Sequence, residues 1–332
     1  MTSFTSIDII AIALAVAHFS IPLIYYLLAK NKWLRNPWNI KTDENHRAKM
    51  TIVIPTYREA NLIGRKLNNI LAQDYPKDQM DVIVVDSASD DGTVESARKW
   101  ISDHRDINVD LLRESERKGK AYALNQALKH ATGEIIVTAD VDASWPRGAL
   151  KEISKWFADP TVGAVSCLKK PVSSSSANIE EDYRHYYNVL RLAESKAYAT
   201  PIFHGELAAF RKSLLEDLGG FPTDIGADDS YTALRIASMG FRAIIPEHLW
   251  VEETVPKKGY SLWRVRRAQH LIQHFTKSVE AKNGAHPEFG RILLIESFLH
   301  LINPWLLLTS ALLLIASIAI FGSTLAMVIA SV

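Results

Sequence analysis

Two carboxylates one residue apart end an apolar run in the segment GEIIVTADVD. The run ends at Ala139 and is rich in β-forming residues, and Asp140 and Asp142 follow it. In an extended segment, side chains at i and i+2 point the same way, about 6.5 Å apart. Their repulsion raises the pKa of one of them unless a cation lies nearby. Mg²⁺ and similar metals bind carboxylates together with substrate phosphates, so the pair predicts a metal-bound ligand, more readily a diphosphate than a monophosphate.

A basic segment precedes the predicted helix at 119–131. The sequence RKGK places Arg117, Lys118 and Lys120 at the start of this helix, where backbone N–H groups and the helix dipole favour anions. The chain has no P-loop signature and no GxGxxG after a strand, so an ATPase and a dinucleotide-dependent oxidoreductase are poorly supported.

Short apolar runs alternate with helical patterns between the two ends of the chain. The runs lack polar alternation at their centres, as strands of a parallel sheet covered on both faces do. The pattern therefore predicts an α/β fold, a doubly wound and mostly parallel sheet. The predicted strands are residues 50–57, 80–89, 108–114 and 133–140, and the predicted helices are 59–72, 92–103 and 119–131.

Unusual polar residues follow three of these strands at their carboxyl ends. The first strand ends in the sequence Pro55-Thr56-Tyr57-Arg58-Glu59, the second at Asp86, and the fourth at Asp140. Any one of these carboxylates alone fits a helix cap or a turn. Ligands of doubly wound sheets bind beyond the carboxyl ends of the strands, so the convergence of all three favours a binding site.

Charge and cysteine content limit the classes of protein. The 332 residues hold 38 Lys and Arg against 37 Asp and Glu, a formal net charge of +1. This balance argues against nucleic acid as the main partner. The single cysteine excludes an internal disulfide and a Cys-based zinc cluster.

Both ends of the chain are apolar enough to enter a membrane. Residues 7–29 match the roughly 20 residues that cross a bilayer. Lys30, Lys32 and Arg35 follow them. We therefore expect an integral protein of the cell membrane, and the positive-inside rule places the domain after these residues in the cytosol. Residues 291–332 are long enough for two spans, which we prefer; alternatively, Asn303-Pro304 separates an interfacial segment from one span.

Two amphipathic segments carry aromatic and basic residues. Residues 178–199 and 260–279 suit a membrane surface. Alternatively, these helices pack on the sheet and leave a basic face in solvent.

Six ordered motifs resemble a known family. Residues 48–255 look like family 2 glycosyltransferases of the GT-A fold. The resemblance rests on the segments IPTYREA, VIVVDSASDDGT, GKAYALNQAL, GEIIVTADVD, GELAAFRKSLLEDLGGFP and ADDSYTALRIASMGFR.

The resemblance implies roles for individual residues. Asp140-Val141-Asp142 matches the DXD motif, whose second Asp usually binds the metal under the diphosphate. Asp228-Asp229 stands where the family has Glu-Asp, and this match makes Asp229 the catalytic base. The implied donor-binding residues are Pro55, Thr56, Tyr57, Glu59, Asp86, Lys120, Asp140 and Asp142. The implied acceptor-binding residues are His204, Gly205, Glu206, Arg266, Arg267, Gln269 and His270.

The resemblance also implies a reaction. One carboxylate acts as the base for the acceptor hydroxyl and none acts as a nucleophile, so the sugar is transferred by direct displacement with inversion at the anomeric carbon. Mg²⁺ or Mn²⁺ stabilises the charge of the leaving diphosphate. The layout is similar to a reduced cellulose synthase, but the segment RRAQHLIQHF lacks the Gln-x-x-Arg-Trp motif of processive enzymes. We therefore expect transfer of one sugar to a membrane lipid or lipid-linked glycan. GDP-mannose is the favoured donor and UDP-glucose the second choice. The alternative is a processive polysaccharide synthase.

Overall fold

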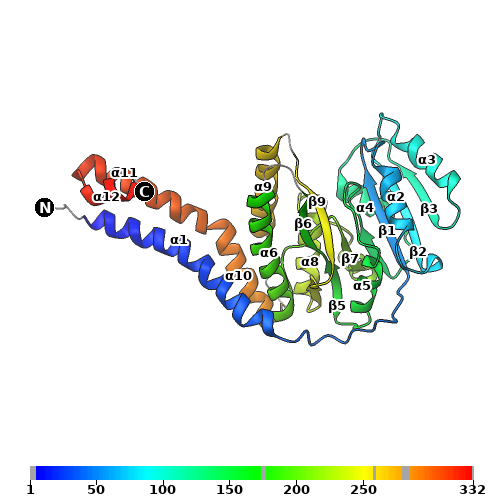
Figure 1. Ribbon diagram of the computed structural model, residues 1–332, viewed down its shortest axis with the longest axis horizontal. Helices are drawn as coiled ribbons and strands as arrows, with labels where there is room; N and C mark the ends of the chain where they lie inside the picture. Colours follow the sequence, from blue (N-terminus) through cyan, green and yellow to red (C-terminus); the bar gives the residue numbers. More distant parts are fainter. Residues whose placement is uncertain (1–4, 173–176, 257–258, 279–284, 331–332) are drawn as a thin grey trace.

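The computed structural model describes residues 5–172, 177–256, 259–278 and 285–330 of the chain. Figure 1 shows an α/β body from which a long helical arm projects. The arm contains α1 (Ser6–Asn31) beside α11 (Asn303–Phe321), with the short α12 (Thr324–Ala330) at its tip. The final residues of two predicted segments, 279 and 331–332, lie outside the described residues.

A seven-stranded sheet forms the centre of the body. Its order is β3-β2-β1-β4-β7-β5-β8, and β7 alone runs antiparallel to its neighbours. The sheet is therefore mostly parallel, as predicted, and the four predicted strands are present. The strands are β1 (Met50–Thr56), β2 (Met80–Asp86), β3 (Asn108–Arg113), β4 (Ile135–Thr138), β5 (Val162–Ser166), β7 (Ala208–Arg211) and β8 (Arg242–Ile244).

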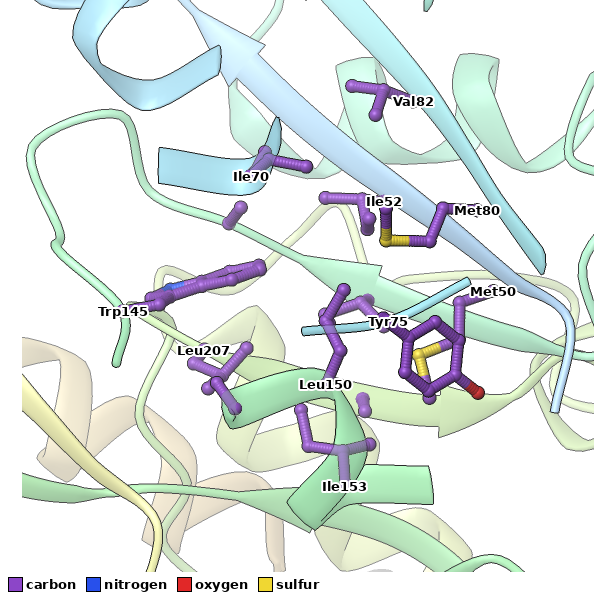
Figure 2. Close-up of a cluster of buried hydrophobic side chains, with 14 of the residues drawn as sticks. Met50, Ile52, Ile70, Tyr75, Met80, Val82, Trp145, Leu150, Ile153 and Leu207 are labelled. Atoms are coloured by element: carbon purple, nitrogen blue, oxygen red, sulfur yellow. The ribbon is translucent and has the colours of Figure 1, made fainter. Parts of the chain in front are cut away.

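Apolar clusters cover both faces of this sheet, because alternate residues of each strand point to opposite sides. In β1, Ile52 and Ile54 join one cluster and Val53 joins the other. Figure 2 shows part of the first cluster, around Met50, Ile52 and Met80. Its helices are α2 (Ile63–Leu71), α3 (Thr93–Asp103) and α5 (Ala149–Trp156). The second cluster is covered by α4 (Lys120–Leu128), α7 (Lys212–Asp217) and α8 (Asp228–Ser238).

A two-stranded parallel sheet extends the body towards the arm. It pairs β6 (Leu168–Val172) with β9 (Trp250–Thr254), next to α6 (Ala177–Ala197) and α9 (Tyr260–Ser278). In α6, Tyr186 stacks on Tyr26 of α1 at 4.9 Å between ring centroids, so part of its aromatic stripe faces protein. In α9, Leu262 and Val265 are exposed. The membrane-surface role of both helices stays a prediction.

Among the described residues, two helical stretches are long and apolar enough to cross a membrane, Ser6–Arg35 and Pro287–Phe321. The second stretch divides beside Asn303-Pro304. There, α10 (Pro287–Leu301) packs against α9 and α6 of the body, and α11 packs along α1. In α10, Phe289 and Leu293 belong to the core of the body. The number of C-terminal spans stays a prediction.

Candidate active site

A cavity of about 620 Å³ lies at the carboxyl end of β4, between the sheet and the helices α6 and α9. Its size is typical of small-ligand sites. The predicted residues in its wall are Lys120, Asp140, His204, Gly205, Glu206, Asp228, Asp229, Arg266, Arg267 and His270. The fold therefore gathers residues that lie up to 150 positions apart in the sequence.

Lys120 and Asp140 form an ion pair in the cavity wall. Gly119, at φ +112°, turns the chain into α4 so that Lys120 begins the helix. Its Nζ donates to Asp140 Oδ1 at 2.6 Å. Burial alone would lower the pKa of Lys120, but Asp140, Asp228 and Asp229 outweigh it and raise the pKa. Lys120 is therefore a cation among three carboxylates, Asp140, Asp228 and Asp229.

The first turn of α8 carries Asp228 and Asp229 into the same cavity. Burial, with the charge of Asp228, raises the pKa of Asp229 to about 7. Burial also raises the pKa of Asp228, whose Oδ2 is buried without a hydrogen-bond partner among the described residues. A carboxylate with a pKa near neutrality has the basicity that a general base requires.

Gly205 brings the backbone close to these charges. A Cβ atom at this position would come within 2.8 Å of Lys120 Nζ and 3.0 Å of Asp229 Oδ2. His204 and Glu206 flank this glycine. Glu206 accepts a hydrogen bond from Lys169 at 2.5 Å. Burial, with the charge of Lys169, lowers the pKa of the His204 ring well below its usual value, so His204 is neutral.

Asp142 has the properties of a metal ligand. It is exposed and makes neither an ion pair nor a side-chain hydrogen bond with another described residue. Partial desolvation and the charges of Asp140 and Glu206 raise its pKa, so a nearby cation would stabilise the carboxylate. No group of three or more His, Cys, Asp or Glu gathers as a metal site among the described residues. A metal held by Asp140 and Asp142 would therefore take its other ligands from a diphosphate and water.

The predicted base- and ribose-contacting residues lie along the same sheet edge, outside the cavity wall. Pro55 and Thr56 end β1, and Asp86 ends β2 beside them. Thr56 Oγ1 and Asp86 Oδ1 are buried without hydrogen-bond partners in the described chain. The Tyr57 ring lies 4.1 Å from the guanidinium of Arg117.

Glu59 lies close enough to Asp142, in the loop of the predicted metal ligands, for their charges to interact. Partial burial raises its pKa, and the charge of Asp142 adds to the rise. The edge thus offers unpaired polar atoms and an aromatic face beside the predicted diphosphate site.

The α9 residues predicted for the acceptor divide into two groups. Arg266, Arg267 and His270 line the cavity, whereas Gln269 is exposed and is not part of its wall. The His270 ring packs so closely on Gly226 that a Cβ atom there would overlap it. Burial and the charge of Arg266 lower the pKa of His270.

Sequence reasoning missed a network that forms the rest of the wall. Glu253 of β9 contacts three cations, Lys169 at 3.1 Å, Arg184 at 2.6 Å and Arg267 at 2.5 Å. Despite burial, these charges lower the pKa of Glu253 to about 2. The wall also includes Tyr183, Tyr187, Arg191 and Trp263. A sequence signal existed, since Tyr183, Arg184, Tyr187 and Arg191 recur at the i, i+1, i+4, i+8 spacing of one helix face.

The comparison with known proteins agrees with this geometry. The profile of the Glycosyl transferase family 2 matches residues 51–219, about half of the chain. The chain belongs to glycosyltransferase family 2. It is therefore a glycosyltransferase of the GT-A fold.

Solved structures extend the similarity beyond the family profile. The mannosyltransferase PcManGT from Pyrobaculum calidifontis, solved in complex with GDP-Man and Mn²⁺, is 54% identical with a TM-score of 0.90, over 98% of this chain and 90% of that one. A fragment of Staphylococcus aureus TarS in complex with UDP-GlcNAc shares the fold at 18% identity and a TM-score of 0.57, over 81% of each chain.

Curated relatives are more distant in sequence than PcManGT. The poly-beta-1,6-N-acetyl-D-glucosamine synthase of Staphylococcus aureus (strain MSSA476) is 28% identical over 271 residues, which cover 78% of this chain. A second such synthase, from Staphylococcus epidermidis, is 25% identical over 269 residues. The chain spans 64% of the length of each of these relatives.

Proposed function

We propose that this glycosyltransferase transfers one mannose, with inversion, from GDP-mannose to a lipid-linked glycan at the cytosolic face of the cell membrane. The observation that carries the donor is the 54% identity, over 98% of the chain, with a mannosyltransferase solved with GDP-Man and Mn²⁺. Mn²⁺ or Mg²⁺ is the proposed metal, and UDP-glucose is the second donor choice. The two apolar helical stretches at the ends of the chain support the membrane location.

The chain's own residues suit a direct displacement. Asp229 is the proposed base that takes the proton of the acceptor hydroxyl, since burial keeps its pKa near 7. Asp140 and Asp142 would hold the metal, which, when bound, stabilises negative charge on the leaving diphosphate. Lys120 adds a cation beside Asp140, only 2.6 Å away. Thr56, Glu59 and Asp86 are the proposed contacts to base and ribose.

The cavity wall offers groups that suit a sugar as the acceptor. Three of its cations, Lys169, Arg184 and Arg267, are paired with Glu253 or Glu206. Such ion pairs place hydrogen-bond donors beside acceptors, which matches the hydroxyls of a sugar. The Tyr183, Tyr187 and Trp263 side chains supply apolar surface for its ring.

A processive synthase is the second candidate. Its support is the similarity to the two staphylococcal poly-beta-1,6-N-acetyl-D-glucosamine synthases. The absence of a Gln-x-x-Arg-Trp motif from α9 argues against it, since the corresponding segment reads RRAQHLIQHF.

The test is a transfer assay with the full chain in nanodiscs. It offers GDP-mannose, UDP-glucose or UDP-GlcNAc with Mn²⁺, and either a polyprenyl-diphosphate monosaccharide or a bare polyprenyl phosphate. We expect the addition of one mannose to the lipid-linked sugar. A ladder of products would support the processive alternative. Transfer only from a UDP-sugar would refute the proposed donor, and transfer only to the phosphate would refute the proposed acceptor.

A further inference from the structure

A lysine occupies the buried face of α2. The buried residues of this helix are Ile63, Lys66, Leu67 and Ile70, the i, i+3, i+4, i+7 spacing of a core-facing stripe. Lys66 is only 1% exposed. Burying an ammonium group is costly unless polar partners compensate for the lost water. The partners of Lys66 therefore indicate its role.

Both close partners of Lys66 lie in the loop that carries the proposed metal ligands. Its Nζ donates to the carbonyl of Ala143 at 2.9 Å and lies 4.0 Å from the ring centroid of Trp145. Among the described residues it makes no direct ion pair with a carboxylate. Burial lowers the pKa of Lys66 to about 7, against the charges of Asp140 and Asp142, which raise it.

Other residues of α2 hold the same loop. Asn69 exchanges two hydrogen bonds with the backbone of Trp145, each of 2.9 Å. Beyond the end of the helix, Gln73 donates to the carbonyl of Pro146 at 3.0 Å. The Trp145 ring belongs to the apolar cluster of Figure 2, with Ile70, Leu150 and Leu207. The loop is thus attached to a rigid helix along residues 143–146, directly after Asp142.

We propose that Lys66 is a positioning residue that, together with Asn69, holds the loop from Asp140 to Trp145 in the arrangement that binds the metal and the diphosphate. This inference rests on the proposed metal site. The charge of Lys66 by itself works against a divalent cation, because like charges repel. Positioning and charge therefore predict opposite effects on metal affinity when the ammonium group is removed.

The experiment measures GDP binding to the full chain in nanodiscs by calorimetry, at a series of Mn²⁺ concentrations. Lys66→Met keeps most of the side-chain length and removes the charge and the hydrogen bond. We expect the Mn²⁺ concentration at half-saturation to rise about 10- to 100-fold, the usual effect of losing a residue that orients a metal ligand. GDP binding in EDTA should stay as in the wild type. Lys77→Met is the matched control, because Lys77 bonds the carbonyls of Leu71 and Gln73 rather than the loop.

A second variant tests the same role in case Lys66→Met does not fold. Asn69→Ala removes two loop bonds without changing any charge, and it should also raise the Mn²⁺ requirement. Unchanged or tighter Mn²⁺ binding in either variant would overturn the positioning role. If wild-type GDP binding does not depend on Mn²⁺ at all, the proposed metal site fails instead.

Discussion

Asp229→Asn separates the chemistry of Asp229 from its effect on folding. The substitution replaces a carboxylate by a neutral amide of the same shape, which resembles protonated Asp. We expect transfer to be abolished while nucleotide binding is nearly unchanged, because Asp229 is the proposed base and not a ligand of the donor. We also expect the variant to be more stable than the wild type at neutral pH.

The size of this stabilisation follows from the pKa of Asp229. The pKa rises from 3.8 to about 7 on folding. Between these values the folded chain holds a proton that the unfolded chain has lost, so the free energy of unfolding of the wild type falls as the pH rises. Three units at 1.36 kcal/mol each give an upper limit of about 4 kcal/mol. Asp229 is only partly buried at the cavity wall, so solvent screening reduces this value.

The assay is denaturant unfolding of both proteins in EDTA, at several pH values between 4 and 8. The two curves should nearly coincide at pH 4 and separate progressively until about pH 7, with the variant more stable. Asp217→Asn, which changes an exposed carboxylate outside the cavity wall, controls for the substitution itself. A stability difference that is constant across this pH range would refute the raised pKa, and retained turnover would refute the role as base.

Three further substitutions test other parts of the site. Asp142→Ala should weaken Mn²⁺-dependent GDP binding and leave GDP binding in EDTA unchanged, both measured by calorimetry. The same Mn²⁺ dependence in the variant as in the wild type would exclude Asp142 as a metal ligand. Gly205→Ala should lower kcat at least 10-fold, since its Cβ would displace Lys120 or Asp229; wild-type kcat would show that these side chains are free to move. Trp145→Phe removes the hydrogen bond that the indole N–H donates to the Glu206 carbonyl at 2.9 Å. The KM for the acceptor should therefore rise and the KM for GDP-mannose should not; a rise in the KM for GDP-mannose alone would contradict this.

Local sequence patterns determined much of the fold. The four predicted strands and their parallel arrangement follow from short apolar runs without polar alternation, because burial on both faces leaves no polar side. The carboxylates Asp86 and Asp140 were placed correctly at strand ends, since strand direction alone brings those ends to one edge of a sheet. The order of six motifs was sufficient to identify the family.

The remaining parts depended on contacts between distant segments. Gln269 lies next to His270 in the sequence, yet it is exposed while His270 lines the cavity, because the rotation of α9 depends on the elements against which it packs. In the sequence, Lys66 was visible only as a lysine on an apolar helix face, and its hydrogen-bond partner, Ala143, lies 77 residues away.

By itself, the sequence determined the α/β fold, the family, the position of the Asp140–Asp142 pair after a strand, and two apolar ends. These features are local, and they follow from periodicity and composition. Only the tertiary structure decided that Lys120, Gly205 and Asp229 meet around one cavity, and that Glu253 gathers the cations of three elements. The physical reason is that side-chain burial and the resulting pKa of each group depend on neighbours that strand pairing and helix packing bring together.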